Sequence, residues 1–237
     1  MTTKPIFVLV HGSCHGGWCW KKIKLILETK GNKVYTPTLT GLGERSHLVQ
    51  ENTNLNTHIQ DIVQEFIYED LRDVILVGHS YGGMVIGGVA EIIPKKIKHL
   101  VYLDAYIPED NKSGFDLVPG LIDIYKKRTL KDQGKEWLVA SYEPQDWGVN
   151  DPNDIMWMKS RLNPMPWHTH DQKLRIQNIQ SKELEKSYII CTEFGDTFLK
   201  RIKQDHNWHF YECKTGHDSM IISPNELAQI LIKIASS

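Results

Sequence analysis

The sequence lacks long apolar runs, has little net charge and contains few cysteines, and each absence excludes a class of protein. No stretch approaches about 18 uninterrupted apolar residues, so we expect no membrane-spanning helix. A formal net charge of −1 gives no electrostatic reason to expect binding to nucleic acid or to an anionic membrane. The four cysteines show no metal-binding spacing, and no G-x-G-x-x-G motif indicates a dinucleotide cofactor.

Features of a secretory signal are also missing. Met1 to Pro5 lead directly into a short strand-like run, with no basic region followed by a long apolar stretch. We therefore expect a cytoplasmic protein whose cysteines are reduced thiols. The oligomeric state stays open, with a homodimer among the alternatives.

What is present is an alternation of apolar runs and helical patterns, which predicts an α/β fold with a mostly parallel sheet covered on both faces. A chain of 237 residues suits a single domain, 1–237, because two ordinary domains with a linker need more. Helices are expected over 18–27, 55–68, 84–93 and 226–234. About six strands are expected, at 6–10, 33–37, 74–79, 100–104, 188–191 and 209–213.

The alternation stops between about Ile107 and Gln180. This stretch holds six of the ten prolines and four of the seven tryptophans, and it is too long for a plain loop. We interpret residues 107–180 as a mostly helical cap inserted over one edge of the sheet. Most of its aromatic side chains are expected to pack the cap onto the core, and one or two to line a pocket.

Ser80 stands in Gly78-His79-Ser80-Tyr81-Gly82, directly between a buried strand and an apolar helix. This match to G-x-S-x-G lies in the context of a nucleophile elbow, a tight turn with the serine at its apex. The glycines suit a turn in which strand and helix backbones approach closely. Chance alone gives such a pentapeptide in about one chain in ten of this length. The interpretation therefore requires a base, an acid and an oxyanion hole elsewhere in the chain.

The expected base is His217. It follows the last predicted strand and precedes the last helix, where the chain order Ser…Asp…His places the histidine. His168-Thr169-His170 could suggest a metal site, but no cysteine or carboxylate lies at a suitable spacing, so no metal is predicted.

Three carboxylates compete for the role of the acid. Asp104 ends an apolar strand and is followed by Ala105, and a buried carboxylate there needs a partner such as His217. Glu193 and Asp196 follow the fifth predicted strand, the commoner position for a triad acid. Asp104 is preferred, with the other two left open. For the oxyanion hole, we expect the backbone amides of Ser13, in the loop after the first strand, and of Tyr81, the residue after the nucleophile.

With these residues in place, the chain resembles the α/β-hydrolase superfamily over nearly its whole length. The run from Phe7 to Trp18, FVLVHGSCHGGW, is similar to the plant methylesterase and hydroxynitrile lyase branch. The run from Thr38 to Arg45, TLTGLGER, is similar to related bacterial esterases, including pyrethroid-hydrolase-like enzymes.

The chain departs from these relatives at informative positions. Plant members carry the acid directly after a Cys-Thr-Glu run, where this chain has Phe194. Some haloalkane dehalogenases, of similar fold, place it in a context like that of Asp104, which supports Asp104. Hydroxynitrile lyases carry threonine in place of Gly12 and lysine in place of Asp218.

The resemblance and these departures together imply a cofactor-free serine hydrolase. It would cleave a small or medium carboxylic ester through an acyl-enzyme, with Ser80, His217 and Asp104 as its triad. The alternatives are a hydroxynitrile-lyase-type C–C lyase, a thioester or lactone hydrolase of a biosynthetic pathway, and a non-catalytic ligand-binding protein.

Overall fold

A six-stranded parallel sheet forms the centre of the protein, for which a computed structural model describes residues 4–195 and 208–236. Its strands lie in the order β2-β1-β3-β4-β8-β9, and every neighbouring pair is parallel. The inner strands are almost wholly buried, as expected where helices cover both faces of a sheet. The strands are β1 (Ile6–Val10), β2 (Lys33–Tyr35), β3 (Val74–His79), β4 (Ile97–Leu103), β8 (Glu185–Cys191) and β9 (Trp208–Cys213).

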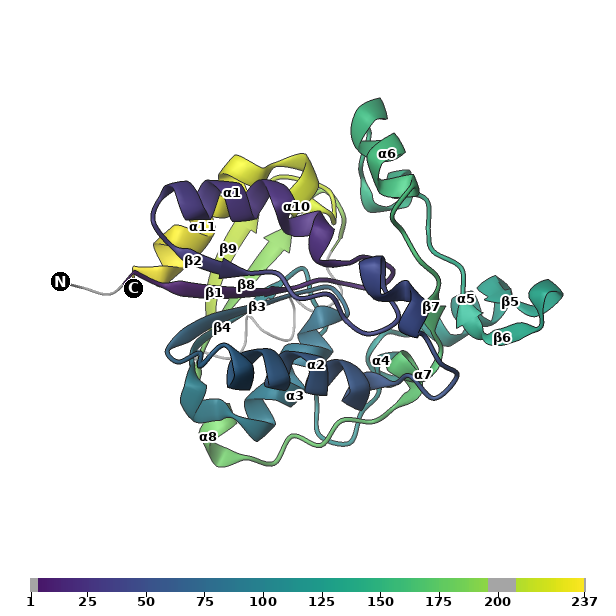
Figure 1. The fold of residues 1–237 in the computed structure, drawn as a ribbon, viewed down its shortest axis with the longest axis horizontal. Coiled ribbons are helices and arrows are strands. Elements are labelled where there is room, and N and C mark those ends of the chain that lie inside the picture. The colour runs from purple at the N-terminus through teal and green to yellow at the C-terminus, as the bar shows by residue number, and fades with distance from the viewer. Residues whose placement is uncertain (1–3, 196–207, 237) are drawn as a thin grey trace.

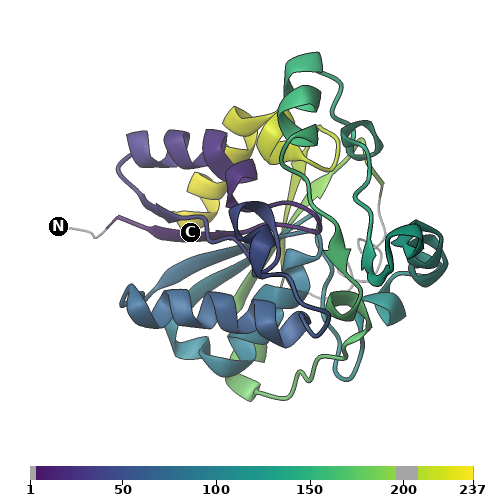
Figure 2. The same cartoon turned by 45° about the vertical axis from the view of Figure 1, so that its right-hand side comes forward.

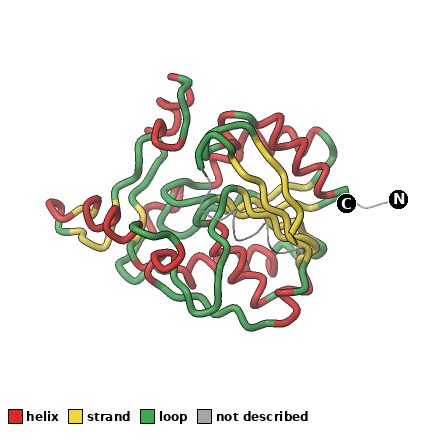
Figure 3. Tube along the Cα trace, turned by 180° about the vertical axis from the view of Figure 1, so that it is seen from behind, coloured by secondary structure: helices red, strands yellow, loops and turns green. Residues whose placement is uncertain are grey.

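Helices cover the two faces of this sheet (Figure 1). On one face lie α1 (Lys21–Thr29), α10 (Ser219–Ile222) and α11 (Pro224–Ala235). On the other lie α2 (Leu55–Tyr68), α3 (Gly82–Ile92) and α8 (Ile179–Lys182). Seen from behind, the strands run as one layer between the two groups of helices (Figure 3). Short 3₁₀ turns complete this part of the chain at η1 (Gly17–Trp20), η2 (Gly43–Leu48) and η3 (Pro94–Lys96).

The apolar side chains of both helix layers pack onto the sheet. Trp20, Phe7 and Phe66 are among the largest side chains that are fully buried in this core. The α2 helix begins with a capping box, in which the Thr57 N–H donates to Asn54 Oδ1 and the Asn54 N–H donates to Thr57 Oγ1. Within the described ranges, no helix is long and apolar enough to cross a membrane.

Most of the segment 107–180, which was expected to form a cap, lies beyond the carboxyl ends of the strands, and its last residues run back beside α3 to α8 (Figures 1 and 2). The segment contains short helices and also an antiparallel sheet in the order β5-β6-β7 that the sequence did not indicate. Two of these strands are only two residues long, too short for a period of two to show. The elements are α4 (Gly114–Leu117), α5 (Leu121–Arg128), β5 (Thr129–Leu130), η4 (Lys131–Gln133), β6 (Lys135–Val139), η5 (Pro144–Trp147), α6 (Pro152–Lys159), β7 (Met165–Pro166) and α7 (His168–Asp171).

Polar contacts tie this segment to the rest of the protein at both ends of the sheet. Lys22 on α1 forms an ion pair of 2.8 Å with Asp154 on α6. Glu91 on α3 accepts from the backbone N–H groups of Gln177 and Asn178, at 2.7 and 2.8 Å. The first contact anchors the segment to α1, and the others anchor its last residues to the C-terminal end of α3.

Candidate active site

Ser80 lies at the tip of a strained turn between β3 and α3. Its φ of 54° is in the left-handed region, which is costly for a residue with a side chain. The turn is held by the Ser80 carbonyl, which accepts from the N–H groups of Gly83 and Tyr106, both at 3.0 Å. A Cβ at Gly78 would lie 2.6 Å from the carbonyl oxygen of Gly82, so a side chain there cannot be accommodated. The sequence context of a nucleophile elbow therefore matches the geometry.

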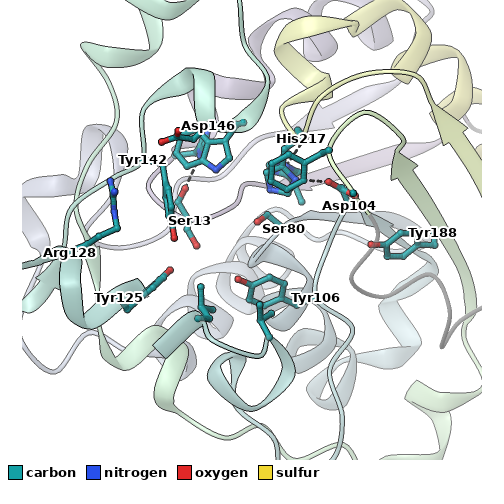
Figure 4. Close-up of a pocket in the computed structure, with 17 residues that line it drawn as sticks. Ser13, Ser80, Asp104, Tyr106, Tyr125, Arg128, Tyr142, Asp146, Tyr188 and His217 are labelled. Carbon is teal, nitrogen blue, oxygen red and sulfur yellow. Dashed lines mark hydrogen bonds and ion pairs between the residues drawn. The ribbon is translucent and has the colours of Figure 1, made fainter. Parts of the chain in front are cut away.

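Beside this turn is a cavity of about 560 Å³ between the strand ends and the 107–180 segment. This volume lies within the range of small-molecule sites. Figure 4 shows Ser80, His217 and Asp104 together in the cavity wall, with His217 between the other two. The cavity is lined by Ser13, His15, His79, Ser80, Asp104, Tyr106, Val118, Leu121, Tyr125, Arg128, Tyr142, Asp146, Trp147, Tyr188, Phe194, Gly195 and His217.

His217 is paired with Asp104. The His217 Nδ1 atom lies 2.6 Å from Asp104 Oδ2, and both side chains are less than a tenth exposed. The other carboxylate oxygen accepts from the Cys191 N–H at 3.4 Å. Because the carboxylate accepts a hydrogen bond from the Nδ1–H group, the neutral imidazole presents Nε2 as an acceptor. This is the tautomer that can remove a proton from a serine hydroxyl.

The end of β4 places Asp104 for this contact. Its backbone N–H donates to the Ile189 carbonyl at 2.8 Å, and its φ of 44° turns the chain away from the sheet. Glu193, an alternative acid, is exposed, and its backbone N–H donates to Thr215 at 3.1 Å. Phe194, beside it, stacks on the His217 ring at 4.4 Å between centroids. Asp196, the other alternative, lies outside the described residues.

The two amides expected to form the oxyanion hole belong to Ser13, in the loop after β1, and to Tyr81, the residue after Ser80. Within the described part of the chain, neither the Ser13 N–H nor the Tyr81 N–H donates to another residue. The loop carrying Ser13 approaches the nucleophile closely, since a Cβ at Gly12 would lie 2.9 Å from the Ser80 Cβ. The threonine that hydroxynitrile lyases carry at this position does not fit the present backbone without a shift.

A second histidine–carboxylate pair, His15 with Asp218, lies buried beside the first. His15 Nε2 is 3.1 Å from Asp218 Oδ2, and His15 Nδ1 is 2.7 Å from the Ser13 carbonyl oxygen. Burial alone would lower the pKa of His15, but the Asp218 carboxylate and the two hydrogen bonds raise it above its ordinary value. A carbonyl oxygen and an ionised carboxylate are both acceptors, so these two contacts favour a proton on each ring nitrogen of His15.

This second pair was not predicted as a unit. In the sequence, Asp218 stood out only as a departure from the lyases, and His15 only as part of a motif. Its partners are 203 residues apart, so no spacing rule connects them. The ion pair holds the loop at Ser13, directly beside the expected oxyanion hole.

His170 supports the opposite wall of the cavity. Its Nε2 lies 3.0 Å from the Tyr125 hydroxyl and 3.3 Å from Ser13 Oγ, and burial lowers its pKa to about 3. His168, its partner in the His-Thr-His sequence, instead contacts Asp171 at 2.8 Å. Across residues 4–195 and 208–236, no three histidine, cysteine or acidic side chains converge on a common point as metal ligands would.

Comparison with known proteins identifies the family. A profile of the alpha/beta hydrolase family matches residues 7–230. The chain belongs to this family. The fold and the superfamily predicted from the sequence motifs are thereby confirmed.

Named relatives cover almost all of this alpha/beta hydrolase. A carbendazim-hydrolyzing esterase of Nocardioides sp. (strain SG-4G) is 36% identical, over 95% of this chain and 97% of its own. Salicylic acid-binding protein 2 of Nicotiana tabacum is 37% identical, over 97% of this chain and 96% of its own. Among solved structures, an extracellular alpha/beta-hydrolase from a Paenibacillus species superposes with a TM-score of 0.84 at 26% identity, covering 97% of this chain and 98% of that one.

Other side chains of this alpha/beta hydrolase site carried no signal in the sequence. Arg128 ends the run Lys126-Lys127-Arg128, a pattern typical of a solvated helix end. Its side chain nevertheless lines the cavity. Tyr125 and Tyr142 also line it, from elements of the 107–180 segment that the sequence did not resolve. Only the folded arrangement brings these residues to Ser80.

Proposed function

We propose that this alpha/beta hydrolase is a serine esterase that cleaves small or medium carboxylic esters. The observation that carries the proposal is the 2.6 Å contact between His217 and Asp104, in one cavity with a serine on a strained elbow. This constellation can activate a hydroxyl as a nucleophile. Relatives covering almost the whole chain include proteins named as esterases, which supports the same reaction class.

In the proposed mechanism, Ser80 Oγ attacks the ester carbonyl while His217 Nε2 takes its proton. The Ser13 and Tyr81 amides donate to the oxyanion of the tetrahedral intermediate. Collapse of the intermediate breaks the bond to the alcohol, which leaves with the proton from His217. Water then loses a proton to His217 and attacks the acyl-enzyme. Collapse of the second tetrahedral intermediate breaks the bond between the acyl carbon and Ser80 Oγ and releases the acid, while His217 returns the proton to Ser80 Oγ. Asp104 keeps Nδ1 protonated throughout and stabilises the imidazolium.

The site favours hydrolysis over the lyase alternative. The position of the lyase threonine is Gly12, which packs against Ser80, and the position of the lyase lysine is Asp218. Asp218 is an acid, so this position offers no cation for a cyanide leaving group, and its side chain is buried against His15. Residues 107–180 are proposed as the cap that sets ester size. The cytoplasmic location and the homodimer stay predictions.

Labelling with a fluorophosphonate, followed by a panel of p-nitrophenyl and methyl esters, tests the proposal. We expect one labelled serine, with label and turnover both lost in Ser80→Ala. The matched control Ser160→Ala changes an exposed serine far from the cavity and should keep both. Esterase activity retained by Ser80→Ala would refute the proposal. Cyanide release from mandelonitrile without ester cleavage would favour the lyase, and activity confined to thioesters or lactones would favour the biosynthetic hydrolase.

A further inference from the structure

One cation in the cavity wall has no assigned role. Arg128 lies at the end of the cavity away from Asp104, beside Tyr142 (Figure 4). Its guanidinium carbon is 4.3 Å from the centroid of the Tyr142 ring. In the described part of the chain, no carboxylate forms an ion pair with this guanidinium.

Arg128 is held in place without using its full donor capacity. Its Nε donates to the Ala140 carbonyl at 3.3 Å, and Nη2 donates to the carbonyl of Ser141. A guanidinium carries five N–H groups, so three remain for a ligand or for solvent. Contact with the Tyr142 ring fixes the plane of the group, which therefore loses little freedom when it binds a planar anion.

We propose that Arg128 gives this cavity a subsite for a carboxylate, so that the protein prefers esters carrying an anionic group remote from the scissile bond. This inference rests on the proposed function, because it identifies the substrate class of the same site. A carboxylate matches the planar donors of the guanidinium and their single charge. A phosphate dianion would call for more positive charge, and the other charged group facing this part of the cavity is acidic, Asp146.

The remaining lining supports this arrangement. Tyr125 places a hydroxyl in the same wall, and Ser13 and Tyr142 lie between Arg128 and Ser80 in the view of Figure 4. An ester bound with its carbonyl at Ser80 would thus extend past these side chains toward Arg128. Asp146 is exposed, and its carboxylate accepts from the Glu143 N–H at 3.0 Å. Its negative charge opposes the binding of an anion at Arg128.

Matched esters of one diacid isolate the effect of the charge. Monomethyl and dimethyl esters from succinate to suberate differ in one carboxylate and hardly in length. Their affinities are measured by calorimetry at low salt with Ser80→Ala, which cannot turn them over. We expect the monoester of one chain length to bind about tenfold tighter than its diester, equivalent to about 1.4 kcal/mol. Added salt should reduce this preference.

Three further substitutions in the same background assign the preference to a residue. Arg128→Gln should abolish it, and Arg128→Lys should retain part, since it keeps the charge but not the planar fork. Asp146→Asn should increase it. Arg161→Gln is the matched control, because Arg161 also stacks on an aromatic ring, that of Trp157 at 5.3 Å, but lies outside the cavity lining. It should leave the preference unchanged.

Two outcomes would overturn the inference. One is equal affinity for monoester and diester at every length. The other is an equal loss of both affinities in Arg128→Gln, which would show that Arg128 only supports the hairpin of β5 and β6. Since binding is measured without turnover, failure of the wild-type protein to cleave any ester would refute the proposed function alone.

Discussion

We expect Asp104→Asn to remove most of the esterase activity while the protein stays folded. In the native site, one carboxylate oxygen accepts from His217 Nδ1 at 2.6 Å and the other from the Cys191 N–H at 3.4 Å. An asparagine oxygen turned toward Cys191 points its NH₂ group at Nδ1. His217 must then carry its proton on Nε2, where it can no longer accept the proton of Ser80.

The magnitude follows from the loss of the correct tautomer. In comparable Ser-His-Asp triads, the same exchange lowers kcat about 10⁴-fold, equivalent to about 5 kcal/mol of transition-state stabilisation. The opposite amide orientation keeps the His217 contact but sets the NH₂ group against the Cys191 N–H. This orientation leaves a donor unpaired and does not restore the charge that stabilises the imidazolium. We therefore expect a loss of about 10³- to 10⁴-fold in kcat.

The assay is steady-state hydrolysis of a p-nitrophenyl ester, with thermal unfolding to verify the fold. Glu193→Gln and Asp196→Asn serve as matched controls, because each removes one of the competing carboxylates, and both should stay within a few-fold of wild type. Loss of several orders of magnitude in Asp196→Asn, with Asp104→Asn nearly unaffected, would show that the assignment of the acid is wrong.

Two further predictions concern the packing and the buried histidines. Gly12→Ala places a Cβ 2.9 Å from that of Ser80, so kcat/KM should fall roughly tenfold or more as the elbow shifts, and unchanged kinetics would contradict the close approach. Burial lowers the pKa values of His11 and His170 to about 3. Between pH 6.5 and 3 the unfolded chain therefore binds more protons than the folded one, and the stability of the folded protein falls as the pH is lowered. Between pH 8 and pH 5, each of the two histidines should lower the free energy of unfolding by about 2 kcal/mol, as measured by urea unfolding. His170→Asn should flatten this dependence, and an unaltered slope would argue against a neutral His170.

The main sheet could be predicted because its strands are buried on both faces. Ile6–Val10 and Val74–His79 are nearly continuous apolar runs, and a single strand–turn–helix context located Ser80. The individual elements of the 107–180 segment, including its antiparallel sheet, could not be predicted because they are too short for a periodic pattern to show in the sequence. Its strand β6 pairs with β5 and β7, which have two residues each, and these pairings depend on tertiary contacts.

The candidate site was predictable where chain order constrains it and obscure where it depends on side-chain direction. His217 was expected from its place after the last strand, where parallel strands end at one edge. Asp104 was preferred to Glu193 and Asp196 because a buried carboxylate at a strand end needs a partner. Arg128 could not be found in this way, because a basic helix end has the same pattern whether it faces solvent or a cavity. Nor could the sequence show that the neighbour of the base, Asp218, turns away from it toward His15.

The two histidine–carboxylate pairs differ in what their second ring nitrogen contacts, and this difference separates their roles. His217 contacts Asp104 through Nδ1, which leaves Nε2 as the ring nitrogen that can accept a proton. His15 contacts Asp218 through Nε2 and the Ser13 carbonyl oxygen through Nδ1, so neither of its ring nitrogens is left to act as a base. The adjacent residues His217 and Asp218 thus support the two halves of the site separately. In the proposed mechanism, His217 activates the nucleophile, while Asp218 and His15 hold the loop whose amide would donate to the oxyanion.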